Sequence, residues 1–136
     1  MVKIIMGVKG SGKTKQLIDL VNKAVNEENG DVVCIEKGQK LTYDIPHAAR
    51  LIEASEYGFT SYDFLKGFIS GLHAENYDIT HVFIDSLLKI LDQAVDAKTE
   101  DFIDWCEAFS ERANVKFTIT ISAETSLATE GIRKFF

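Results

Sequence analysis

Short apolar runs alternate with stretches of helical spacing along this chain of 136 residues. The runs 2–6, 31–36 and 115–122 are rich in β-branched residues, which is typical of buried strands. The run 81–85 predicts a further strand, and 50–54 predicts a short one. We therefore expect five strands, separated by segments of a different pattern.

Most of the intervening segments predict helices. Helices are expected over 12–28, 61–75 and 87–97, from a cap at Thr99 onwards, and within 125–136. Ser61 stands before the second of these, where a hydroxyl can cap the first turn. The segment 37–49 contains Gly38, Asp44 and Pro46, and predicts a loop.

Strands that alternate with helices build a mainly parallel sheet with helices on both faces. The expected fold is an α/β fold, a three-layer α/β/α sandwich with a mainly parallel five-stranded sheet. The length and the absence of a linker predict one domain over 1–136. Ligands in such folds bind at the carboxyl ends of strands, where Glu36, Asp85 and Ser122 are expected.

The most specific motif is the segment Gly7–Thr14, which we call the glycine-rich loop. It reads G-V-K-G-S-G-K-T and matches the phosphate-binding pattern G-x-x-x-x-G-K-S/T between a strand and a helix. Glycines let successive N–H groups curl around an anion, and the helix N-terminus favours negative charge. The expected nucleotide-binding residues are Gly7, Val8, Lys9, Gly10, Ser11, Gly12, Lys13, Thr14 and Lys15. The alternative is a glycine-rich turn with a solvated lysine.

With this motif the chain resembles the P-loop NTPase superfamily. Lys13 would reach the β- and γ-phosphates, and the Thr14 hydroxyl would bind Mg²⁺. The run Val82-Phe83-Ile84-Asp85 is similar to a Walker B strand, whose carboxylate would be the second Mg²⁺ ligand. Asp85 alternatively caps the helix that follows it, and both roles are compatible.

Ser86 follows Asp85, where many ATPases have a catalytic glutamate. The sequence is here similar to the RecA-like and AAA-type branch. In the RecA-like branch, that glutamate closes the strand after the P-loop helix. This resemblance makes Glu36 the candidate base; the alternative is a solvated carboxylate.

In the same branches a strand lies between the P-loop strand and the Walker B strand, and its tip carries a γ-phosphate sensor. Thr120 and Ser122 are candidates for this sensor, or else ordinary strand surface. Arg133 is a candidate arginine finger acting in a neighbouring subunit, or else a solvated charge in the tail.

Composition narrows the classes of partner. The net charge is −6 and the lysines are scattered along the sequence, which argues against nucleic acid. No apolar run is long enough to span a membrane, and the N-terminus resembles no signal peptide, so we expect a cytoplasmic protein. Cys34 and Cys106 are expected to be free buried thiols. Helical spacing in 57–68 assigns its aromatic residues mainly to the core.

No N-K-x-D guanine motif is present, so ATP is the expected nucleotide, with Mg²⁺ as cofactor. The stretch Gly12–Leu17 also resembles compact bacterial thymidine kinases, but their zinc cysteines are missing. Three functions remain: an ATP-binding protein with weak or partner-stimulated hydrolysis, a small-molecule or nucleotide kinase, and a non-catalytic nucleotide sensor. The first would act with a second copy of itself or a protein partner.

Overall fold

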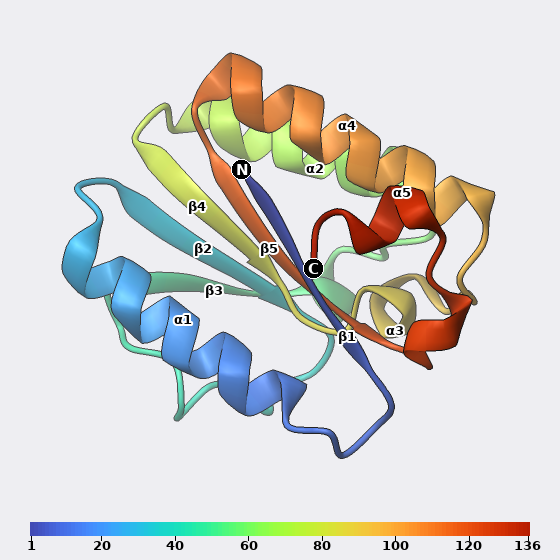
Figure 1. Cartoon of the computed structure of the whole chain (residues 1–136). Coiled ribbons are helices and arrows are strands. Elements are labelled where there is room, and N and C mark those ends of the chain that lie inside the picture. The colour runs from blue at the N-terminus through green and yellow to red at the C-terminus, as the bar shows by residue number, and fades with distance from the viewer.

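The computed structural model describes residues 1–136, with a single five-stranded sheet at the centre. The strands are β1 (Val2–Gly7), β2 (Asp31–Glu36), β3 (Ala49–Glu53), β4 (Ile79–Ile84) and β5 (Lys116–Ser122). Their order is β1-β5-β4-β2-β3, and every neighbouring pair is parallel (Figure 1). All five carboxyl ends therefore lie at one edge of the sheet, and β5 separates β1 from β4, as expected.

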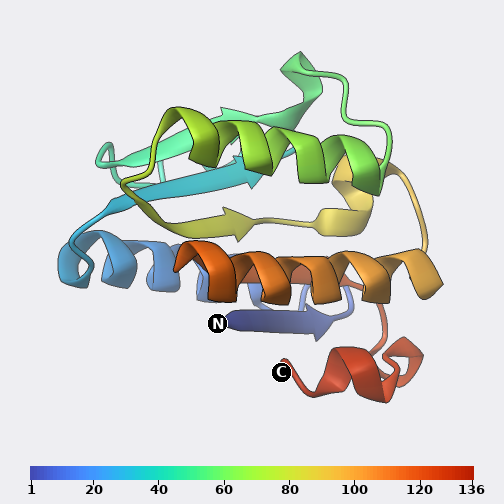
Figure 2. The same cartoon turned by 90° about the horizontal axis from the view of Figure 1, so that it is seen from above.

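Helices cover both faces of the sheet, which makes three layers. Helix α1 (Lys13–Glu27) lies on one face, and α2 (Tyr62–Glu75) and α4 (Ala97–Ala113) lie side by side on the other (Figure 2). Two further helices are short, α3 (Leu87–Leu91) and α5 (Glu130–Arg133). No helix has both the length and the apolarity that crossing a bilayer requires.

Each face of the sheet has its own hydrophobic core. The larger core holds 26 buried residues and joins the sheet to α2 and α4 through side chains such as Leu65 and Phe102. The smaller core holds nine and lies under α1, where Leu17 and Val21 meet the loop residue Leu41. Because Leu41 is 1% exposed, the loop between β2 and β3 is anchored in this core.

Two predictions between β4 and β5 are wrong. The helix expected over 87–97 ends at Leu91, because Asp92 adopts a left-handed conformation, with φ of 52°, that stops it. The next helix is capped by Asp96 instead of Thr99. Asp96 accepts the N–H groups of Lys98 and Thr99, and the Thr99 hydroxyl accepts the N–H of Asp96 in return.

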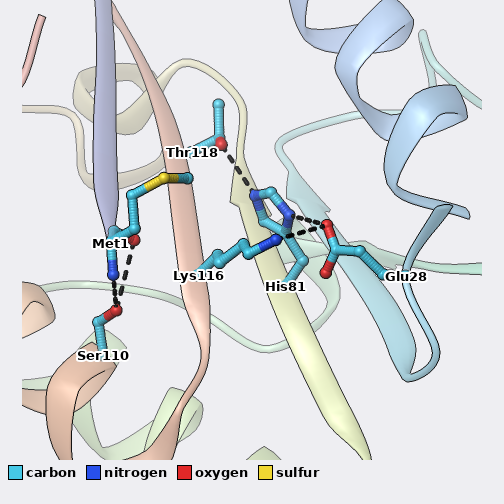
Figure 3. Close-up of polar contacts among 6 residues, drawn as sticks. All are labelled: Met1, Glu28, His81, Ser110, Lys116 and Thr118. Atoms are coloured by element: carbon cyan, nitrogen blue, oxygen red, sulfur yellow. Dashed lines mark hydrogen bonds and ion pairs between the residues drawn. The ribbon is translucent and has the colours of Figure 1, made fainter.

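A buried polar cluster fastens the C-terminal end of α1 to the sheet (Figure 3). His81 Nδ1 lies 2.8 Å from Glu28 Oε2, and His81 Nε2 lies 2.9 Å from Thr118 Oγ1. Burial lowers the pKa of His81, so the neutral ring donates to Glu28 and accepts from Thr118. Lys116 adds an ion pair to Glu28 at 3.7 Å. This cluster lies at the amino ends of β4 and β5, opposite to the glycine-rich loop.

Candidate functional site

The glycine-rich loop joins the end of β1 to the start of α1. Gly10 and Gly12 both have φ of +86°, a left-handed conformation that residues other than glycine rarely adopt. Gly12 also precedes the first helical residue and offers no side-chain cap. Several N–H groups of the loop and of the first turn of α1 donate to no acceptor in the chain: those of Gly10, Gly12, Lys13, Thr14 and Lys15.

Lys13 lies inside the loop instead of extending into solvent. The residue is 7% exposed, and its Nζ donates to the Val8 carbonyl at 2.8 Å and to Ser11 Oγ at 3.3 Å. Burial lowers the pKa of Lys13, and the charge of Asp85 opposes that shift. The ammonium group is thus held next to the exposed N–H groups of the loop.

These loop residues line a cavity of about 520 Å³ at the carboxyl edge of the sheet. Its wall contains Lys9, Gly10, Gly12, Lys13, Thr14, Lys15, Lys40, Ser86, Lys89 and Ser122. A smaller cavity of about 60 Å³ is lined by Thr14, Glu36, Lys37, Lys40, Asp85, Ser86 and Lys89. Because Thr14, Lys40, Ser86 and Lys89 belong to both walls, the two cavities adjoin.

Asp85 follows the last residue of β4 and is 9% exposed. Its N–H donates to the Ile35 carbonyl at 2.9 Å, and its Oδ1 accepts the Thr120 hydroxyl at 2.8 Å. Thr120 Oγ1 in turn accepts the N–H of Ser86 at 2.7 Å. Ser86 has a left-handed backbone with φ of 56°, an unusual conformation for serine. The neighbouring strand β2 therefore holds the backbone of Asp85, and Thr120 of β5 orients its carboxylate.

Glu36 ends β2 and is only 2% exposed, so it is not the solvated carboxylate that the alternative interpretation predicts. Its Oε2 accepts the N–H of Leu41 at 3.1 Å. Burial raises the pKa of Glu36, and the nearby charges of Asp85 and Glu53 act in the same direction. Glu36 therefore holds the loop after β2 while lining the same small cavity as Asp85.

The donor set around the small cavity suits a hard cation. Thr14 supplies a hydroxyl and Asp85 a carboxylate whose Oδ2 accepts no hydrogen bond within the chain. Mg²⁺ needs few protein oxygens because it keeps several waters and binds substrate phosphates. The chain has no group of three or more acidic, histidine or cysteine side chains positioned for a metal. Thr14 and Asp85 thus fit Mg²⁺ as partners of a bound phosphate.

The other sequence candidates separate in space. Ser122 is exposed and lines the large cavity, whereas Thr120 is fully buried and serves as the partner of Asp85. Arg133 lies elsewhere, and its guanidinium donates to the carbonyls of Ala128 and Thr125 at 3.1 and 2.8 Å. Arg133 is thus engaged within its own C-terminal segment.

The lysines, which are scattered in the sequence, are clustered in the structure. The two cavities are lined by six of them: Lys9, Lys13, Lys15, Lys37, Lys40 and Lys89. Sequence reasoning missed Lys40 and Lys89 because one follows β2 and the other follows β4. The only available signal was that each of these strands ends in a candidate site residue.

Comparison with known proteins gives no matching family model and no matching curated sequence.

Proposed function

We propose that the chain binds ATP with Mg²⁺ at the glycine-rich loop and hydrolyses it slowly. The observation that carries the proposal is the cavity of about 520 Å³ in which unpaired backbone N–H groups and lysines surround the motif residues. Phosphates satisfy both kinds of donor, and the N-terminus of the 15-residue helix α1 adds a favourable dipole. The motif and its surroundings thus support the same ligand class, a nucleoside triphosphate. Membership of the P-loop NTPase superfamily is part of this proposal.

Each side chain of the site has a role in this proposal. Lys13 binds the β- and γ-phosphates, while Thr14 and Asp85 hold Mg²⁺, which neutralises phosphate charge when bound. Glu36 accepts a proton from water as the water oxygen attacks the γ-phosphorus. The bond between that phosphorus and the β–γ bridging oxygen breaks, and ADP and phosphate leave. The raised pKa of Glu36 favours this role, because a base works best with a pKa near the working pH.

Lys13→Ala tests the binding site directly. We expect ATP-Mg²⁺ affinity to fall by roughly a hundredfold or more, because charge-assisted hydrogen bonds to two phosphates are lost. The measurement is isothermal titration calorimetry of the full chain, with thermal unfolding to verify the fold. Lys23→Ala, an exposed lysine on the same helix, is the control of equal charge change. Equal ATP affinity in wild type and Lys13→Ala contradicts the proposal.

A nucleotide-dependent sensor is the second candidate, and the loop between β2 and β3 favours it. This loop carries Lys37 and Lys40 to the cavities and is fastened at Glu36 and Glu53, whose Oε1 accepts the N–H of Gly38 at 2.7 Å. A phosphate bound by Lys40 would tighten this loop and present it to a partner. Strong ATP-dependent hydrogen-exchange protection over 37–48, with turnover at background, supports the sensor over the hydrolase.

A further inference from the structure

The large cavity offers positive charge to a ligand but no ring on which a nucleotide base could stack. Its ten lining residues include no hydrophobic residue and no aromatic ring. Sites that recognise a flat ring normally surround it with apolar or aromatic side chains. The wall here instead consists of loop backbone, hydroxyl groups and five lysines. This lining fits a chain of phosphates, and it contains no feature that would recognise the nucleoside attached to that chain.

Lys40 and Lys89 lie where the end of such a chain would be. Both line the large cavity and also the small one that contains Asp85. Lys40 stands directly before the buried Leu41, whose N–H is held by Glu36, so its backbone is anchored. Lys89 belongs to α3, which starts two residues after Asp85.

These two lysines are close together, and neither forms an ion pair with a carboxylate. The positive charge of Lys40 is the main cause that lowers the pKa of Lys89, and Lys9 and Lys37 add to it. The three ion pairs of the chain involve Lys66, His81 and Lys116, and neither lysine of the cavity wall. Cations that repel one another in an acidic protein are stabilised when an anion binds between them.

We propose that the site selects its ligand by the length and charge of a phosphate chain, with Lys40 and Lys89 holding the terminal phosphate. The ligand class is then nucleoside triphosphates of any base together with inorganic tripolyphosphate. This inference rests on the proposed function, in which the loop surrounds the phosphates and Lys13 binds the β- and γ-phosphates. Lys40 and Lys89 would then distinguish triphosphate ligands from diphosphate ligands. The pair would take the place of an arginine finger within the chain.

The test is calorimetric titration of the full chain with ATP, GTP, CTP, tripolyphosphate, ADP and pyrophosphate at fixed Mg²⁺ and ionic strength. We expect the four triphosphates to bind within roughly tenfold of one another, because their recognised part is shared. The diphosphates should bind roughly tenfold to a hundredfold more weakly, since they lack the phosphate that both lysines contact.

The double variant Lys40→Ala/Lys89→Ala should weaken triphosphates to about the affinity of diphosphates and change diphosphate binding by less than about threefold. Lys40→Arg/Lys89→Arg should retain the preference, because arginine keeps the charge. Lys23→Ala/Lys98→Ala removes two exposed lysines outside both cavities and controls for net charge.

Each outcome decides the inference. A preference for ATP over GTP, CTP and tripolyphosphate of more than about a hundredfold overturns it, because the base is then recognised. An unchanged ratio of ATP to ADP affinity in the double alanine variant also overturns it, while binding that depends on Lys13 leaves the proposed function intact. If no phosphate ligand binds the wild-type chain, the proposed function fails and the inference fails with it.

Discussion

The two carboxylate oxygens of Asp85 have different surroundings. Oδ1 accepts the Thr120 hydroxyl at 2.8 Å, and Thr120 is itself fixed by the N–H of Ser86. Oδ2 accepts no hydrogen bond within the chain, and Asp85 lines the small cavity with Thr14. One oxygen therefore fixes the side chain, which leaves the other for a cation.

Asp85→Asn keeps the shape of this side chain and an oxygen that can accept from Thr120, but removes the charge. We expect the Mg²⁺-dependent part of ATP affinity to fall by roughly tenfold or more, with less effect on nucleotide binding without metal. Titrations with ATP over a series of Mg²⁺ concentrations measure both. Asp104→Asn, at an exposed position on α4, is the control. The same Mg²⁺ dependence in Asp85→Asn and wild type excludes Asp85 as a metal ligand.

Glu36 combines a structural contact with the chemistry expected of a base. Glu36→Gln can still accept the N–H of Leu41, so the loop should stay in place. We expect turnover to fall by roughly a hundredfold or more at unchanged ATP affinity. Wild-type turnover should rise with pH through the raised pKa of Glu36, because the carboxylate is the active form, and this rise should vanish in the variant. Turnover that survives in Glu36→Gln leaves Glu36 only the role of anchoring the loop.

At the scale of elements, the connection between α3 and α4 fixes where one helix ends and the next begins. Asp92 ends α3 with a left-handed residue, and Asp96 begins α4 with a reciprocal cap that includes Thr99. The Thr99 hydroxyl also lies 2.8 Å from the Tyr62 hydroxyl, which links α4 to the start of α2. Side chains therefore satisfy the start of α4, whereas the backbone of Asp92 ends α3.

Asp96→Ala removes the acceptor of this cap. We expect a loss of about 1 kcal/mol in the free energy of unfolding, because the N–H groups of Lys98 and Thr99 lose their partner. Asp96→Asn should retain most of the stability, since asparagine is also a good cap. Urea denaturation measures both variants. Equal stability of Asp96→Ala and wild type means that water replaces the carboxylate without cost.

At the scale of the whole molecule, the two ends of the sheet have different polar chemistry. The carboxyl end holds the lysine-lined cavities, and the amino end holds the buried cluster of His81, Glu28 and Thr118. Figure 3 shows the His81 ring between the Glu28 and Thr118 side chains, which come from different elements. This cluster joins three separated parts of the chain and has a titratable group at its centre.

The cluster predicts an acid-sensitive stability. Because burial lowers the pKa of His81, the unfolded chain binds more protons than the folded one as pH falls below about 6.5. The free energy of unfolding should therefore stay constant above that pH with respect to His81. Below it, the free energy should fall by at most about 1.4 kcal/mol per pH unit. In His81→Gln this loss should disappear near pH 6, because the titrating ring is gone. Urea denaturation from pH 5 to 8 measures this; identical pH profiles contradict it.

Much of the fold follows from local patterns. β2 and the Ser61 cap lie where apolar periodicity and capping chemistry predict them, because both depend on residues close in sequence. The five-stranded parallel sheet follows from the alternation of strands and helices. The errors around Asp92 and Thr99 arise where several residues can end or cap a helix, and tertiary contacts such as that with Tyr62 favour one of them.

The candidate site divides in the same way. The sequence is sufficient to identify Gly7–Thr14, because a turn that exposes successive N–H groups needs glycines at set spacings within one short segment. It is not sufficient to show that Glu36 is buried, that Thr120 holds Asp85, or that Lys40 and Lys89 meet. Those relations depend on strand order, which brings segments far apart along the chain to one edge of a parallel sheet.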